Sequence, residues 1–188
     1  DALRSPDDLL FFHEAGVRMI GLAWAEGSLY AGGDQSGGDL TAVGREMVEA
    51  IDELPDCVHD VSHLSERAFW SVIERAGRPA LASHSNCRPL LTGKVHPERH
   101  LSDEQIRALA ERDGVIGINL FGRFLTAEPI PPARPGIGEV VGHIEHVAGV
   151  AGRRACVGLG SDADRGFSTD LLPVGLERPE HLWRLAEA

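Results

Sequence analysis

Short apolar runs alternate with longer amphipathic stretches along this chain, and the alternation predicts strands followed by helices. The expected buried strands are residues 17–23, 58–61, 80–82, 114–120 and 155–159. The expected helices begin at Ser5, Thr41, Ser65, Ser102 and Ile137, and a last one covers residues 179–188. Residues 25–40, rich in glycine and polar side chains, are expected to form a long loop of functional type.

Serine and threonine mark the expected helix starts, because their side chains accept a hydrogen bond from the first-turn N–H groups. Ser5 begins an S-x-x-D pattern and is followed by proline at the first helical position. Ser102 begins an S-x-x-Q capping box. Both patterns are typical of helix N-termini.

Strands that alternate with helices indicate an α/β fold with a parallel sheet covered by helices. The five strand-helix units predict a partial (β/α)8 TIM barrel, with residues 1–188 as a single domain. A doubly wound open sheet is the alternative, but no glycine-rich phosphate fingerprint opens a helix here. The chain starts with Asp1 and its last helix lacks a cap, so truncation at both ends is expected.

Composition narrows the classes of function. The content of 43% hydrophobic and 25% charged residues is ordinary for a globular protein. A net charge of −11 argues against a nucleic-acid surface, and no apolar run reaches the ~18 residues of a membrane span. The 3 cysteines have no C-x-x-C spacing, which favours a reducing, cytoplasmic compartment.

Two Ser-His pairs follow successive strands of the predicted βαβ unit. Ser62-His63 directly follows the run 58–61, and Ser83-His84 directly follows the run 80–82. Because parallel strands put their carboxyl ends at the same edge of a sheet, both imidazoles are expected there, as ligands of zinc or a similar ion. A single histidine would more simply cap a turn; the repeated pair favours a site. Asp60 is expected on the other strand face, where it could orient an imidazole.

Of the other polar residues, some are expected at the same sheet edge and others are expected to have structural roles. Asn119 and Asp162 lie at the ends of the two later strands, where a barrel carries its catalytic residues. His59 is expected to be structural. His143 and His146 have i, i+3 spacing on a helix, which suits a metal, but we expect them on a solvent-exposed outer face.

Several short motifs together resemble the renal (membrane) dipeptidase family, the M19 metallopeptidases within the amidohydrolase-like barrels. The matching segments, in family order, are residues 16–18, DVSH at 60–63, SHSN at 83–86, HPER at 96–99, residues 114–119 and GLGSDAD at 158–164.

The resemblance implies hydrolysis of dipeptides at a binuclear zinc site. In that family both histidines of these motifs bind metal, which implies His63 and His84. Arg99 matches the arginine that grips the substrate's terminal carboxylate, a bidentate task suited to guanidinium. Asp162 matches the aspartate near the substrate amine and the bridging water, which makes it the candidate for moving a proton to the leaving amine. A homodimer is also implied.

The chain departs from the family pattern in three places. The family's H-x-D pair and bridging glutamate are expected upstream of Asp1, so the 188-residue chain alone is expected to be inactive. Trp24 occupies the place of a substrate-contacting histidine; it is expected to line the substrate site, with a core tryptophan as the alternative. Asp162 to Arg165 reads DADR instead of DFDG.

Two alternatives stay open. One is another amidohydrolase-type reaction on small amides or lactones. The other is a catalytically incomplete barrel that acts as a binding or scaffold domain, because two imidazoles alone hold zinc weakly and a catalytic site supplies three or more ligands.

Overall fold

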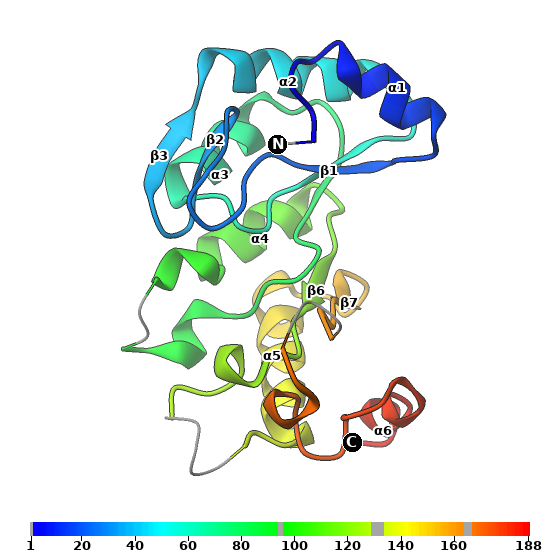
Figure 1. Ribbon diagram of the computed structural model, residues 1–188. Helices are drawn as coiled ribbons and strands as arrows, with labels where there is room; N and C mark the ends of the chain where they lie inside the picture. Colours follow the sequence, from blue (N-terminus) through cyan, green and yellow to red (C-terminus); the bar gives the residue numbers. More distant parts are fainter. Residues whose placement is uncertain (1, 94–95, 129–133, 164–166) are drawn as a thin grey trace. The chain divides into compact units, whose positions relative to one another are not determined.

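The computed structural model describes residues 2–93, 96–128, 134–163 and 167–188 (Figure 1). These residues form two compact units, each described by itself below. The first unit comprises residues 1–83 and 112–114, and the second comprises residues 84–111 and 115–188.

The first unit is built on a parallel sheet with the strand order β1-β4-β5. His59 at the centre of β4 is paired with Ile20 of β1 on one side and Ala80 of β5 on the other. The helix α2 contacts β4, and α3 contacts a β2–β3 hairpin. The elements are α1 (Asp8–Glu14), β1 (Met19–Gly21), β2 (Ala31–Gly33), β3 (Gly37–Leu40), α2 (Ala42–Glu53), β4 (Val58–Asp60), α3 (Glu66–Arg75) and β5 (Ala80–Leu81).

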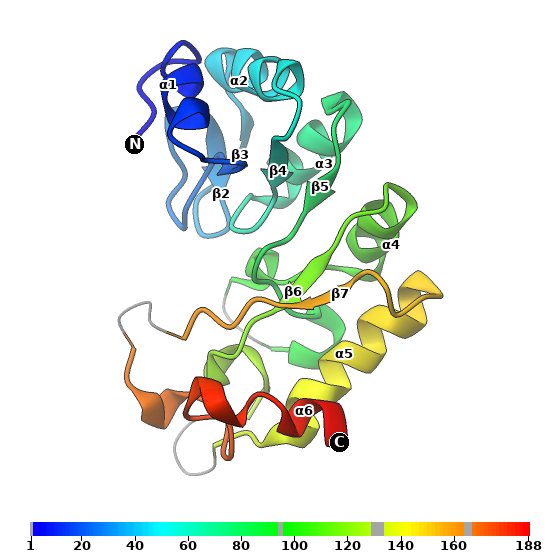
Figure 2. The ribbon, with the colours of Figure 1, turned by 90° about the vertical axis from the view of Figure 1, so that its right-hand side faces the viewer.

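The second unit contains a parallel pair of strands, β6 and β7, with Ile116 opposite Val157. The helix α5 packs against both strands and lies beside α4 (Figure 2). The elements are η1 (Arg88–Leu91), η2 (Pro97–Arg99), α4 (Asp103–Glu111), β6 (Ile116–Ile118), η3 (Gly122–Phe124), α5 (Ile137–Ala151), β7 (Val157–Leu159), η4 (Thr169–Leu171), η5 (Pro179–His181) and α6 (Arg184–Glu187).

Most of the expected helix starts are confirmed. The Thr41 hydroxyl accepts the Gly44 N–H at 3.0 Å, and the Ser65 hydroxyl accepts the Ala68 N–H at 3.1 Å. The capping box at Ser102 is complete: the Gln105 side chain accepts the Ser102 N–H at 2.9 Å, and the Ser102 hydroxyl accepts the Gln105 N–H at 3.3 Å. These bonds satisfy first-turn N–H groups that have no partner inside the helix.

The prediction of a cap at Ser5 is wrong, because α1 begins at Asp8 with no side-chain cap. The Asp8 carboxylate turns back to accept the Arg4 N–H at 2.9 Å, and the Ser5 carbonyl accepts the Asp8 N–H at 3.2 Å. The last helix is also shorter than predicted, since a 3-10 turn at Pro179–His181 precedes α6.

The predicted loop at residues 25–40 contains the β2–β3 hairpin. Its strands are rich in glycine, so they lack the apolar alternation that identifies a strand. The two strands approach so closely that a Cβ at Gly32 would lie 2.0 Å from the Gly37 carbonyl oxygen. A side chain is excluded there, which explains why the sequence uses glycine.

All five predicted strands are present as parallel strands, which confirms the α/β fold class, but β1 and β7 are only partly buried. Among the described residues they form a three-stranded and a two-stranded parallel sheet, and no closed barrel. The single domain over residues 1–188 stays a prediction. Most of the proline-rich segment 129–135 lies outside the described residues.

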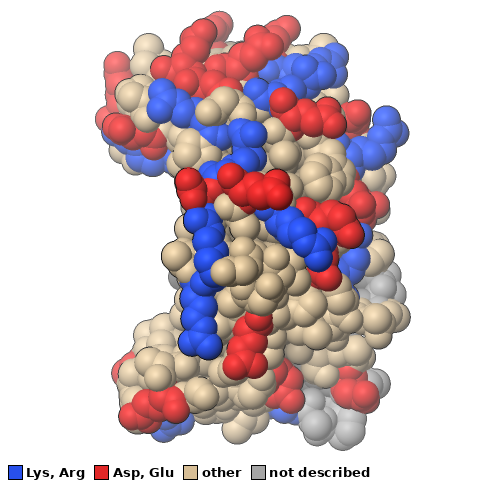
Figure 3. All heavy atoms as spheres, turned by 180° about the vertical axis from the view of Figure 1, so that it is seen from behind, with Lys and Arg blue, Asp and Glu red and all other residues tan. Residues whose placement is uncertain are grey.

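The surface and the cysteines agree with the composition. On the face that Figure 3 displays, lysine and arginine side chains are interspersed with aspartate and glutamate. Cys57, Cys87 and Cys156 are free, buried thiols. In the described part of the chain, every helix is too short or too polar to cross a bilayer.

Candidate functional site

His63 lies in the turn that follows β4, in a left-handed backbone conformation with φ of 67°. Its Nδ1 is 2.8 Å from the Asp34 carboxylate, whose side chain is only 1% exposed. An ionised carboxylate only accepts hydrogen bonds, so Nδ1 carries the proton and the lone pair of the neutral ring is on Nε2. Carboxylates hold metal-binding histidines in this way, so the ring fits a metal ligand.

Asp60 ties together the chain segments that precede both predicted histidine ligands. Its Oδ1 accepts the backbone N–H groups of Ser62 and Ser83, both at 3.0 Å, and its Oδ2 accepts the Ser83 hydroxyl at 2.5 Å. The carboxylate therefore organises the backbone after β4 and β5, where a bond to an imidazole had been considered.

Trp24 lies beside His63 in the first unit. Its ring centroid is 6.1 Å from that of His63, with the ring planes tilted by 51°. The indole is 70% exposed and borders a cavity of about 240 Å³ that Leu22 and Tyr30 also line. An exposed aromatic surface next to a candidate metal ligand suits contact with a substrate, and that role stays a prediction.

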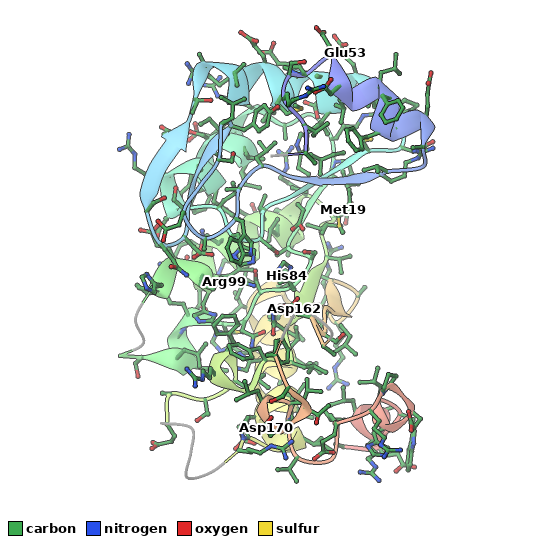
Figure 4. The ribbon with its side chains drawn as sticks, in the orientation of Figure 1. Met19, Glu53, His84, Arg99, Asp162 and Asp170 are labelled. Carbon is green, nitrogen blue, oxygen red and sulfur yellow. The ribbon has the colours of Figure 1, made fainter. Side chains whose placement is uncertain are left out.

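Arg99 and His84 are held together in the second unit (Figure 4). The Arg99 guanidinium donates to the His84 carbonyl at 2.8 Å and to the Ser85 hydroxyl at 3.2 Å. It lies 5.1 Å from the centre of the Phe124 ring, and the residue is only 5% exposed. This buried arginine fixes the turn that carries His84; its grip on a substrate carboxylate stays a prediction.

Asp162 follows β7, also in a left-handed conformation, with φ of 56°. The Asn119 side chain donates to the Asp162 carboxylate at 3.2 Å. Asn86 in turn accepts the Asn119 N–H at 2.8 Å and donates to the Asn119 carbonyl at 3.1 Å. Two buried asparagines thus orient the predicted proton carrier. Asp164 and Arg165, part of the departure from the family motif, lie outside the described residues.

The prediction that His143 faces solvent is wrong. It lies on the same face of α5 as Val140 and Val147, and all three are buried. Its Nδ1 accepts the Cys87 N–H at 3.1 Å, and its Nε2 donates to the Leu125 carbonyl at 3.3 Å. Burial lowers the pKa of His143 to about 4, so the ring is a neutral structural group.

His146 and His59 have structural partners. His146 bonds through Nε2 to the Asp103 carboxylate at 2.7 Å, which links α5 to α4. His59 is 1% exposed and bonds through Nε2 to Asp52 at 2.8 Å, as a structural residue would. Burial lowers the pKa of His59. Within the described residues, no group of three or more His, Cys, Asp or Glu side chains is placed to hold a metal.

The burial of His143 predicts a stability that falls with acid. The unfolded chain takes up a proton near the ordinary pKa of about 6.5, whereas the folded ring does so only near 4. This contribution is complete above pH ~6.5 and is lost as the pH falls towards 4, to a total of about 3 kcal/mol. Urea unfolding at several pH values should give a flatter profile for His143→Asn than for the wild type. An unchanged profile would contradict the buried neutral ring.

Comparison with solved structures defines the class of protein. The chain is similar to a metallo peptidase from Rhodobacter sphaeroides, solved with a phosphinate mimic of the dipeptide L-Ala-D-Ala. The two share 29% identity with a TM-score of 0.82, over 96% of this chain and 51% of that one. The described fold is therefore that of about half of a metallo peptidase.

Sequence comparison gives the family. The model of the membrane dipeptidase family, peptidase family M19, matches residues 1–188, and the chain belongs to this family. It is 31% identical to an uncharacterized dipeptidase of Schizosaccharomyces pombe, over 97% of this chain and 44% of that protein. It is 34% identical to an uncharacterized protein of the pqqA 5′ region of Klebsiella pneumoniae, over 84% of this chain and 59% of that protein. The chain thus spans about half the length of these curated relatives.

Sequence reasoning missed Asp34. It lies in the segment predicted as a loop, 29 positions before its partner His63. Gly32 and Gly33 just before it indicate a close backbone approach, but no sequence pattern connects this aspartate with a particular histidine.

Proposed function

We propose that the protein is a zinc-dependent dipeptidase in which His63 and His84 contribute metal ligands. The observation that carries the proposal is the bond from His63 Nδ1 to the buried Asp34 carboxylate, within a chain of the M19 family. This is the chemistry of a metal-binding imidazole, since a ring held through Nδ1 presents Nε2. Further ligands complete such a site, because a catalytic zinc takes three or more from the protein.

Two bound zinc ions would supply a water activated near neutral pH and a polarised scissile carbonyl. Side chains of this chain bind the substrate and transfer the proton. Arg99 binds the terminal carboxylate of the dipeptide, and its hydrogen bonds to His84 and Ser85 keep the guanidinium in place. Asp162, oriented by Asn119, moves a proton to the leaving amine. Trp24 contacts the substrate beside His63.

The substrate class follows from the family and from a relative. The Rhodobacter sphaeroides metallo peptidase holds a mimic of L-Ala-D-Ala, which makes short dipeptides with either configuration at the second residue the substrates to test. Hydrolysis of other small amides or lactones is the alternative reaction, and a non-catalytic binding domain is the alternative of another class. The homodimer implied by the family resemblance stays a prediction.

A substrate panel tests the proposal on the complete natural protein, with the 188-residue chain alone for comparison. We expect release of free amino acids from L-Ala-L-Ala or L-Ala-D-Ala, and much slower release from the amidated dipeptide, which lacks the carboxylate that Arg99 would bind. A chelator should stop the reaction. Preference for lactones, or equal rates on amidated dipeptides, would contradict a dipeptidase, and an inactive protein would favour the binding domain.

A further inference from the structure

The β2–β3 hairpin is joined to the turn that carries His63. The Asp34 N–H donates to the His63 carbonyl at 2.9 Å, and the Ser65 N–H donates to the Gly32 carbonyl at 3.0 Å. The Ser65 hydroxyl donates to the Gly38 carbonyl at 2.6 Å. An isolated bridge also pairs Gly33 with Leu64. The hairpin and the turn at residues 63–65 are therefore one hydrogen-bonded structure within the first unit.

Glycine makes this close packing possible. A Cβ at Gly33 would lie 2.3 Å from the carbonyl oxygens of both Trp24 and Ala25. No real side chain fits such a contact, so the position admits only glycine. The Gln35 N–H, next to Asp34, donates to the Ala25 carbonyl at 2.9 Å. The chain around Asp34 is thus locked on both sides, and its carboxylate has a fixed position.

Burying this carboxylate is costly unless a specific partner compensates. The Asp34 side chain is 1% exposed, while its partner ring at His63 is 16% exposed. The two partners therefore differ in exposure: the carboxylate is buried, and the imidazole is the more exposed group of the pair. The exposed indole of Trp24 lies beside this imidazole, with the two ring centroids 6.1 Å apart.

We propose that Asp34 is the positioning residue of His63, and that the β2–β3 hairpin exists to deliver it. Its backbone N–H holds the His63 carbonyl in the left-handed turn, and its carboxylate holds Nδ1–H. Together the two bonds fix the tautomer and the orientation of the ring, so that Nε2 is presented to zinc and its basicity is increased. This inference rests on the proposed function, because it takes His63 as a zinc ligand.

The test compares zinc affinity in Asp34→Ala and Asp34→Asn with the wild type, using the complete natural protein, a chromophoric chelator as competitor and His63→Ala as the reference for a lost ligand. We expect Asp34→Ala to bind zinc about 10- to 100-fold more weakly. Asp34→Asn keeps the side-chain volume and one acceptor oxygen, so its zinc affinity should fall about tenfold. This variant replaces Asp34→Ala in the test if the alanine variant does not fold. Asp39→Asn is the matched control, because Asp39 lies on the same hairpin but bonds Ser71 and is 41% exposed.

A spectroscopic readout separates positioning from mere structural support. In metal-free protein, ¹⁵N NMR distinguishes the two neutral tautomers of a histidine ring and should show the His63 ring protonated at Nδ1 in the wild type and in Asp39→Asn. Asp34→Ala should shift the ring towards the Nε2-protonated form. Wild-type zinc affinity in both Asp34 variants, or an unchanged tautomer in Asp34→Ala, would overturn the positioning role. A wild type that binds no zinc would overturn the proposed function itself, and this role with it.

Discussion

Replacing His63 or His84 by alanine is expected to reduce dipeptide hydrolysis by far more than 100-fold in the complete natural protein. Removal of a group that only supports a metal ligand typically costs 10- to 100-fold, and a lost ligand should exceed that range. The loss should appear in kcat, because the activated water depends on the bound metal. Zinc content after dialysis should fall in both variants.

His146→Gln is the matched control for these substitutions. It removes an imidazole whose partner is Asp103 on α4 and which has no contact with His84 or Arg99 among the described interactions. Its activity should stay within a few fold of the wild type. Either alanine variant with near-wild-type rate and metal content would show that the histidine is structural.

The second large effect is expected at Asp60. Its carboxylate accepts three hydrogen bonds, from the N–H groups of Ser62 and Ser83 and from the Ser83 hydroxyl. Asp60→Ala leaves these donors without their acceptor, and hydrogen bonds to charged groups contribute about 1.5–3 kcal/mol each. Because the contributions are not additive, we expect the free energy of unfolding to fall by about 3 kcal/mol in total.

Urea unfolding measures this loss, and amide hydrogen exchange localises it. Protection of the Ser62 and Ser83 amides should fall in Asp60→Ala and recover in part in Asp60→Asn, whose amide oxygen still accepts. Asp56→Ala is the control, since Asp56 is exposed just before β4. A wild-type unfolding midpoint for Asp60→Ala would contradict the view that this carboxylate holds the two Ser-His segments in place.

The sequence was most informative where the physical cause is local. The starts of α2, α3 and α4 followed from Thr41, Ser65 and Ser102, because a cap depends on residues within one turn. The five parallel strands followed from short apolar runs, a pattern that is local to each strand. The predicted cap at Ser5 is absent, and the Asp8 carboxylate accepts the Arg4 N–H.

Long-range partners were the part that the sequence did not disclose. The hairpin at residues 31–40 depends on backbone contacts between glycines, which leave no hydrophobic pattern. The prediction that His143 faces solvent rested on placing its helix on the outside of a barrel, whereas the residue shares its helix face with the buried Val140 and Val147. The bond between Asp34 and His63 spans two elements, and only the fold brings them together.

Zinc reconstitution of the complete natural protein is the measurement that decides most about the proposed function. Metal-stripped protein is titrated with zinc while hydrolysis of L-Ala-D-Ala is followed. We expect no activity without metal and a rise that ends at about two zinc ions per chain, as in other two-metal hydrolytic sites. Hydrolysis by the metal-free protein, or a protein that neither binds zinc nor cleaves any dipeptide, would contradict a zinc-dependent dipeptidase.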